Sequence, residues 1–371
     1  MARVCHGDNL RAAWATVRRH KGQGGSDGLS LADFERDLLA RLRDLQTRLQ
    51  GGTYRPLPLK AIRLPKANGR WRLIRIPSVA DRIVQQAILR VIEPRFERKF
   101  CECTFGFRPG RSAHQAVRRI QDALRQGLVW VVEADLEDFF DTLDRPLLLA
   151  ELAREIPDRA LLHLIRRCLA AGDARGEPGN PVGRGTPQGA VFSPLLANAY
   201  LHPFDTALTA KGLHLTRYGD DFVTLHRTRA EAVEALSYVR EVLQGELKLR
   251  LNAAKTRIVH ADAPGFDFLS FRFAHGGMVP APNAVERFKA DVQRIMQDCR
   301  HRSRELLRAR LEPLVRGWGG YFRVGQVDRL YQELDAWVQR QLRAVVQPGF
   351  AIVSLTEILG KPRKGGRSPA G

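Results

Sequence analysis

Short runs of apolar and β-branched residues, bounded by polar or Gly- and Pro-rich segments, predict six strands. They are Ala61–Pro65, Trp71–Ile76, Val129–Ala134, Leu215–Tyr218, Phe222–His226 and Phe268–Phe273. Several stretches with helical apolar spacing follow a Ser or Thr that has Asp, Glu or Gln three residues later, as helix N-termini often do. These pairs are Ser30 and Asp33, Ser78 and Asp81, Ser112 and Gln115, and Thr228 and Glu231. Strands and helices are interspersed without a regular βαβ repeat, which predicts an α+β fold.

The segment 286–346, within the C-terminal third of the chain, has the apolar spacing of amphipathic helices. It is also basic, with Arg300, Arg302, Arg304, Arg308 and Arg310 close together. Gly319 and Gly320 predict a bend in one helix, and the neighbouring aromatic residues are expected in the core. Two interpretations stay open: these helices bind a nucleic acid duplex or folded RNA, or they form a plain bundle with a solvated basic face.

The segment Tyr218-Gly219-Asp220-Asp221 separates two short apolar runs and predicts a hairpin with two carboxylates at its tip. Aspartate is a poor strand former, and adjacent like charges repel, so a bound cation would explain the pair. Mg²⁺ prefers carboxylate oxygens and substrate phosphates. An ordinary exposed turn is the alternative for this segment taken alone.

A second group of carboxylates begins at Asp135, directly after the predicted buried strand that ends at Ala134. Asp135, Asp220 and Asp221 can therefore converge on two Mg²⁺ ions about 3.5–4 Å apart, the usual arrangement for nucleotidyl transfer. The alternative for the segment 135–141 is an acidic helix start, where carboxylates complement the helix dipole.

Charge indicates which polymer such a site would serve. The 371 residues include 60 Lys and Arg against 40 Asp and Glu, a net charge of +20. A basic excess of this size is typical of proteins that bind a phosphate backbone. No apolar run approaches the ~18 residues of a spanning helix, and Met1–Asp8 lacks a signal-peptide pattern. We therefore expect a soluble cytoplasmic protein, associated with the nucleoid if DNA is bound, and no membrane partner.

The order of several motifs resembles that of group II intron-type reverse transcriptases. The matching segments include Gly52–Pro56, Asp81–Ala87, Phe105–His114, Gly185–Gly189, Ser193–Asn198, Tyr218–Asp221, Leu251–Thr256 and Gly265–Leu269. With Asn9–Trp14 as the first of them, the matching segments span roughly residues 9–275. Some positions depart from the family pattern: Gly219 stands where Ala is more frequent, and Ser270 where Gly is usual.

The resemblance implies a right-hand polymerase with fingers, a palm that contains a small antiparallel sheet, and a helical thumb. On this basis residues 1–125 form an N-terminal extension and fingers. Residues 126–275 form the palm, with inserted fingers helices at about 145–185. Residues 276–346 form a thumb and maturase-like region, and 347–371 form a basic tail. No Cys- and His-rich endonuclease module of the HNH type follows residue 346.

The resemblance also implies a role for individual residues. Asp135, Asp220 and Asp221 match the palm carboxylates that hold two Mg²⁺ ions, for which Mn²⁺ can substitute. Lys255 matches a lysine that protonates the leaving pyrophosphate, although a structural lysine is the alternative. Lys66 and Arg72 match residues that grip the dNTP, with Arg70 and Arg75 as alternatives for this role.

Two further positions concern the choice of nucleotide. Phe140 matches a steric gate against the ribose 2′-hydroxyl, with a core phenylalanine as the alternative, and Gln188 matches a residue beside the nascent base pair. The residues expected to contact nucleic acid are Arg108, Arg111, Arg302, Arg304 and Arg308.

The function that follows is RNA-directed DNA polymerisation, with an RNA template such as intron RNA, a DNA primer, a cDNA product and dNTPs. The protein would be encoded by a group II intron and assist its splicing. Two alternatives stay open. One is a domesticated relative in antiphage defence or CRISPR spacer acquisition, with protein partners. The other is an RNA-binding maturase with an idle polymerase site.

Overall fold

The computed structural model describes residues 1–65, 71–173, 183–300, 302–345 and 352–360. The chain divides into two compact units, each built from segments far apart in sequence. Unit 1 contains Met1–Ser112, Val132–Thr224 and Ala230–Arg257, and unit 2 contains Ala113–Val131, Leu225–Arg229 and Ile258–Gly371. The four-part division into fingers, palm, thumb and tail stays a prediction.

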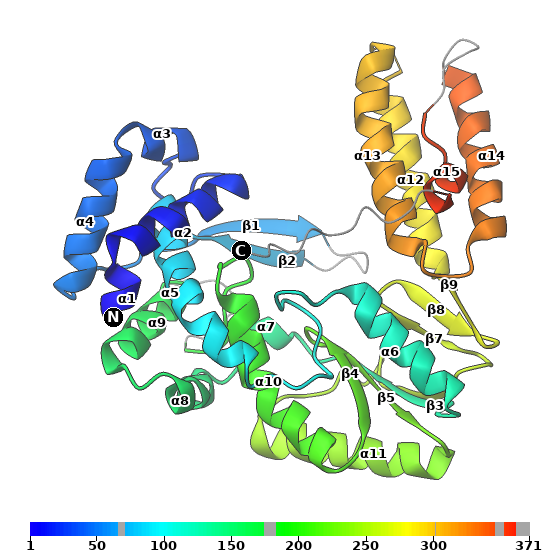
Figure 1. The fold of residues 1–371 in the computed structure, drawn as a ribbon, viewed down its shortest axis with the longest axis horizontal. Helices are drawn as coiled ribbons and strands as arrows, with labels where there is room; N and C mark the ends of the chain where they lie inside the picture. Colours follow the sequence, from blue (N-terminus) through cyan, green and yellow to red (C-terminus); the bar gives the residue numbers. More distant parts are fainter. Residues whose placement is uncertain (66–70, 174–182, 301, 346–351, 361–371) are drawn as a thin grey trace. The chain divides into compact units, whose positions relative to one another are not determined.

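Unit 1 begins with a cluster of helices (Figure 1). They are α1 (Ala2–Cys5), α2 (Gly7–Arg19), α3 (Leu31–Arg36), α4 (Leu38–Gln50) and α5 (Val79–Glu97). Ser30 and Asp33 form the predicted reciprocal capping box at the start of α3. Ser78 likewise accepts a hydrogen bond from the Asp81 amide at the start of α5. The capping signals therefore identified these two helix starts.

Two antiparallel strands, β1 (Lys60–Pro65) and β2 (Trp71–Ile76), form a separate hairpin in unit 1, at the positions predicted for them. The other helices of this unit follow later in the sequence. They are α7 (Phe139–Thr142), α8 (Arg145–Glu155), α9 (Arg159–Ala170), α10 (Ser193–Ala210), α11 (Arg229–Glu241) and the π-helix η1 (Val242–Glu246). Helix α7 and η1 are short. Thr228 immediately precedes α11, as its capping pattern predicted.

A four-stranded sheet carries the candidate active site, with the strand order β4–β5–β3–β6. The strands are β3 (Trp130–Ala134), β4 (His214–Tyr218), β5 (Asp221–His226) and β6 (Arg257–His260). The first three confirm predicted strands, whereas β6 was not predicted. Helix α10 packs against β4 (Figure 1). It is apolar on nearly every side and is therefore buried, and its polar residues Asn198 and Asp205 are both fully buried.

Unit 2 contains a three-stranded sheet and a group of helices (Figure 1). Its elements are α6 (Ala113–Arg125), β7 (Phe266–Phe268), β8 (Phe271–Ala274), β9 (Gly277–Pro280), α12 (Pro282–Asp298), α13 (Arg304–Phe322), α14 (Asp328–Val345) and α15 (Leu355–Leu359). The prediction of one strand over Phe268–Phe273 was wrong. Leu269 and Ser270 have positive φ angles of 50° and 65° and turn the chain between β7 and β8.

The predicted bend at Gly319 and Gly320 was also wrong, because α13 continues through both glycines. A Cβ atom at residue 319 would lie 2.8 Å from side-chain carbons of Leu355 and Ile358. Glycine therefore lets α13 and α15 approach closely. Of the neighbouring aromatic residues, Phe322 is buried in the core, as predicted. Trp318 and Tyr321 are half-buried, and the Trp318 ring lies 4.7 Å from that of Phe288. Among the described helices, none combines the length and the apolar character that a membrane crossing requires.

Candidate active site

The candidate catalytic residues Asp220 and Asp221 lie at the tip of a hairpin, as the sequence predicted. Strand β4 ends at Tyr218, Gly219 and Asp220 form the turn, and β5 begins at Asp221. Gly219 has a φ angle of +69°, which is easily adopted only by glycine. Because β5 lies between β4 and β3 in the sheet, one strand of the hairpin, β5, directly neighbours the strand that leads to Asp135.

Asp135 follows β3 directly and is held by the segment around Asn252. The backbone oxygen of Asp135 accepts a hydrogen bond of 2.8 Å from the Asn252 amide. Its carboxylate accepts one of 2.7 Å from the Lys255 ammonium group. The pairing of Leu136 with Leu251 continues this contact along the backbone. The fold thus brings Lys255 to a catalytic candidate that is 120 residues away in sequence.

The three aspartates interact electrostatically. Desolvation, together with the negative charges of Asp220 and Asp135, raises the pKa of Asp221 to about 7, although part of its surface is exposed to solvent. Hydrogen bonding to Asp135 raises the pKa of Lys255, so this lysine is charged at neutral pH. Repulsion of this kind between carboxylates is what a divalent cation would relieve.

The donor set therefore fits Mg²⁺, which takes carboxylate oxygens. Within the described ranges, however, no three His, Cys, Asp or Glu side chains already form a metal-holding group. The fit thus depends on the donor chemistry and on the mutual repulsion of the carboxylates, and not on a preformed cage.

The loop Gly185–Gly189 lies against α7 and β2. The Thr186 amide donates to the Phe140 backbone oxygen at 2.7 Å, and the Gln188 backbone oxygen accepts from the Arg75 amide at 2.7 Å. Both Phe140 and Gln188 are half-buried. Phe139 is the buried core residue of this pair, 2% exposed, whereas Phe140 retains surface that a substrate could contact.

Of the predicted dNTP-gripping residues, Lys66 and Arg70 lie outside the described residues, as does the side chain of Arg72. Arg75 is an unsuitable substitute, because it is only 5% exposed and its guanidinium lies 3.4 Å from Asp141. Arg75 is therefore not available to grip a dNTP.

The structure also contradicts the expected contact of Arg108 with nucleic acid. It is 8% exposed, pairs with Glu97 at 3.1 Å and donates to the backbone oxygens of Cys101 and Thr104. Because its guanidinium already bonds to these internal partners, Arg108 stabilises the fold and does not suit a phosphate contact. Arg111 is half-buried and pairs with Glu102 at 2.5 Å. Its contact with nucleic acid stays a prediction.

The thumb arginines Arg302, Arg304 and Arg308 are all exposed, at or just before the start of α13. Arg308 lies 3.9 Å from Glu312 on the same helix. Their surface position is compatible with a phosphate contact, which likewise stays a prediction.

Sequence reasoning missed the role of Arg217, which is fully buried beneath the hairpin. It bonds to Asp205, Asn198 and the backbone oxygen of Gly219. The available signal was a charged residue inside the predicted strand Leu215–Tyr218, directly after the run Leu213–Thr216 and just before Asp220 and Asp221. A buried charge of this kind needs a partner.

Two family models match the chain. One, described as "Reverse transcriptase (RNA-dependent DNA polymerase)", covers residues 64–273. The other, described as "Group II intron, maturase-specific domain", covers residues 285–350. The first contains all of the palm candidates, and the second contains most of the basic helical region.

Two curated relatives extend this result. The chain is 35% identical to Protein YkfC of Escherichia coli over 286 residues, 67% of this chain and 75% of that protein. It is 30% identical to the group II intron-encoded protein LtrA of Lactococcus lactis over 213 residues, 57% of this chain but only 35% of that protein. The chain thus spans about a third of the length of LtrA.

A solved structure of telomerase from Candida albicans, in complex with a telomeric RNA fragment, has a similar fold. Its TM-score is 0.50 and its identity 13%, with 81% of this chain and 58% of the telomerase chain covered. Identity at this level supports a shared fold alone. Together with the two family models and the curated relatives, these similarities show that the chain belongs to the group II intron-type reverse transcriptase family.

Proposed function

We propose that this protein copies RNA into cDNA by adding dNTPs to a DNA primer. The observation that carries the proposal is the convergence of three carboxylates and one lysine on one end of the palm sheet. Asp221 begins β5, Asp135 follows β3, and Lys255 bonds to Asp135 at 2.7 Å. The net charge of +20 suits a phosphate-backbone ligand.

Asp135, Asp220 and Asp221 would hold two divalent ions, Mg²⁺ or Mn²⁺. Ions bound there would favour the ionised primer 3′-hydroxyl and neutralise charge on the triphosphate. In the reaction, the primer 3′-oxygen bonds to the α-phosphorus of the dNTP, and the bond to the pyrophosphate oxygen breaks. The proton of the primer hydroxyl passes to solvent, and pyrophosphate leaves with the electron pair of the broken bond.

Lys255 is the group in this site that can supply a proton to the leaving pyrophosphate. Its ammonium group is charged and already lies beside Asp135. General acid catalysis of this kind typically contributes about 10²–10⁴ in rate. An alternative role is to neutralise Asp135 before the metal ions bind. The variant Lys255→Met distinguishes the two roles.

Phe140 and Gln188 would define the nucleotide pocket, because the Gly185–Gly189 loop lies against both α7 and β2. Glycine is required at this contact. A Cβ atom at Gly185 would lie 2.7 Å from the Phe140 backbone oxygen, and one at Gly189 would lie 2.8 Å from that of Arg75. The half-buried Phe140 ring would exclude a ribose 2′-hydroxyl and so select dNTPs.

For the biological role, we propose that the protein acts with a group II intron RNA as template and assists its splicing. The maturase-specific match at 285–350 and the intron-encoded relative LtrA support this role. The exposed arginines at the start of α13 would contact the RNA backbone. An intron RNA around the gene would favour this role, whereas a CRISPR array beside it would favour the defence alternative.

The test is primer extension by the purified protein on a heterologous RNA template, with dNTPs and rNTPs in separate reactions. The control is the Asp220→Ala/Asp221→Ala double variant. We expect extension with dNTPs and Mg²⁺ that is lost in the double variant. Extension that survives the double substitution would refute the assignment of these aspartates. Tight RNA binding without extension would support the maturase alternative.

A further inference from the structure

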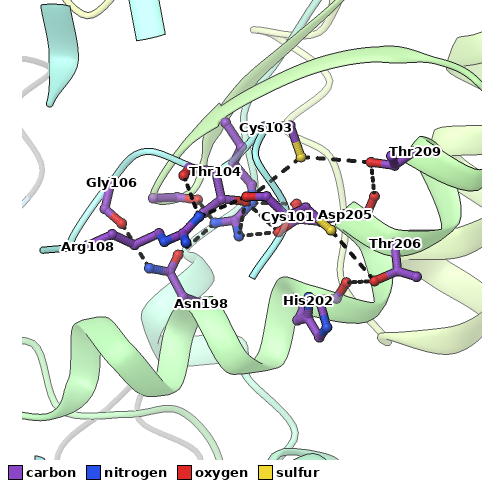
Figure 2. A network of polar contacts seen from close by, with 12 residues as sticks. Cys101, Cys103, Thr104, Gly106, Arg108, Asn198, His202, Asp205, Thr206 and Thr209 are labelled. Atoms are coloured by element: carbon purple, nitrogen blue, oxygen red, sulfur yellow. Dashed lines mark hydrogen bonds and ion pairs between the residues drawn. The ribbon is translucent and has the colours of Figure 1, made fainter. Parts of the chain in front are cut away.

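A buried polar network lies directly beneath the Tyr218–Asp221 turn. Its centre is Arg217, the penultimate residue of β4, whose side chain is 0% exposed. The partners come from helix α10 and from the loop around Thr104. Figure 2 shows Thr104, Asn198 and Asp205 gathered at this point. The reaction proposed above does not use any of these groups, so the network needs its own explanation.

The guanidinium of Arg217 donates hydrogen bonds to four residues, among them Thr104 at 3.2 Å. Two nitrogens bind the Asp205 carboxylate, at 2.7 and 2.5 Å. A third nitrogen donates to the Asn198 side-chain oxygen at 2.9 Å and to the Gly219 backbone oxygen at 2.7 Å. The last of these contacts ties the catalytic turn itself to a helix in the core.

Asn198 holds the turn by a second route. Its amide donates to the backbone oxygen of Gly106 at 2.8 Å (Figure 2). Gly106 in turn lies against the catalytic turn: a Cβ atom on it would be 2.4 Å from the Gly219 nitrogen. Helix α10 therefore fixes both the oxygen of Gly219 and the segment that covers its nitrogen.

Packing alone does not explain this arrangement. A buried ion pair is often replaced by apolar residues of similar volume without loss of stability, so a stable core does not require Arg217. Arginine is, however, the side chain whose rigid fork of donors can bind a carboxylate, an amide oxygen and a turn carbonyl together. Lysine, with one ammonium group, lacks this geometry.

We propose that Arg217 is a positioning residue that sets the location of Asp220 and Asp221 for metal binding, by holding the Gly219 carbonyl against α10. The inference rests on the proposed function, because it assigns to the network the placement of the aspartates that would carry the reaction. Asp205 and Asn198 hold the guanidinium in place for this purpose.

The test compares Arg217→Lys with the double variant Arg217→Met/Asp205→Leu. The double variant avoids leaving an unpaired buried charge, which would itself be strongly destabilising. Neither variant can reproduce the bond to Gly219 while also binding α10. The measurements are the melting temperature, the affinity for primer–template, the single-turnover rate of dNTP addition, and Mn²⁺ affinity by electron paramagnetic resonance.

We expect both variants to fold and to bind primer–template as the natural protein does. A displacement of the aspartates by about 1 Å should reduce the single-turnover rate by about 100-fold and weaken Mn²⁺ binding. Amide hydrogen exchange at Gly219 and Asp220 should become faster. Unchanged Mn²⁺ affinity and unchanged rate per folded molecule would overturn the proposal.

A matched control is Tyr54→Phe, which removes a buried hydrogen bond of 2.5 Å to Asp81 in the same unit. It should lower stability but leave Mn²⁺ affinity unchanged, so a general loss of stability is distinguishable from misplacement of the turn. If the natural protein extends no primer, the proposed function fails. The Mn²⁺ and hydrogen-exchange measurements still decide the role of Arg217 in that case.

Discussion

Replacing Gly106 by Ala is the smallest change that should displace the catalytic turn without removing any catalytic group. An added Cβ atom would lie 2.4 Å from the Gly219 nitrogen and 2.9 Å from the Tyr218 carbonyl carbon. Both contacts are with backbone atoms, which cannot rotate away as the end of a flexible side chain could. Either the turn or the loop that contains residue 106 must therefore move.

The size of the movement follows from these distances. Non-bonded heavy atoms are favourable at about 3.5–4.0 Å, so the two segments must separate by about 1 Å. Misplacement of this size costs about 100-fold in rate, equivalent to about 2.7 kcal/mol of transition-state stabilisation. The overpacking itself should lower the free energy of unfolding by about 1–3 kcal/mol.

The assay is single-turnover addition of one dNTP to a primer annealed to RNA, with primer–template affinity measured separately. Gly245→Ala is the matched control, because a Cβ atom at that position meets nothing within 4 Å and the residue has no positive φ angle. The control should retain full activity. A Gly106→Ala variant that adds dNTP within about twofold of the natural rate, against the loss of about 100-fold expected from misplacement, would refute the argument that the loop around Gly106 fixes the turn.

Three other substitutions test separate parts of the account. Phe140→Ala should admit rNTPs while retaining dNTP addition, measured by competition on an RNA template, and unchanged discrimination would exclude the steric gate. Lys255→Met should slow single-turnover addition by about 10²-fold or more if the lysine is a general acid. If it only neutralises Asp135, high Mg²⁺ should restore the rate. Arg108→Met should lower the melting temperature but leave the salt dependence of RNA binding unchanged, whereas a reduced salt slope would identify a phosphate contact.

Three strands of the four-stranded sheet, β3, β4 and β5, could be predicted because their signal is local. A run of β-branched and aromatic residues ends just before Asp135, and the hairpin at Gly219 has a turn residue between two apolar segments. The candidate catalytic carboxylates follow directly from those strand ends. For the same reason, the capping signal at Ser30 identified the start of α3.

The errors occurred where tertiary contacts override local preference. Gly319 has the appearance of a helix breaker, yet it lies inside α13 because α15 packs closely against it. Leu269 and Ser270 belong to an apolar run but adopt left-handed backbone conformations and make a turn. Arg108 has the charge of a phosphate contact but is buried against Glu97. In each case the outcome depends on a contact with another segment or on the backbone conformation, and the local sequence pattern shows neither.

The most direct test of the central claim is Mn²⁺ binding by the natural protein and by Asp135→Asn, measured with a chain-terminated primer on RNA and the matching dNTP. If Asp135, Asp220 and Asp221 together hold the catalytic ions, the natural protein should bind two Mn²⁺ in this complex. The asparagine variant should lose at least one of them while still binding primer–template. Equal Mn²⁺ stoichiometry and affinity in the two proteins would contradict the assignment of Asp135 as a metal ligand.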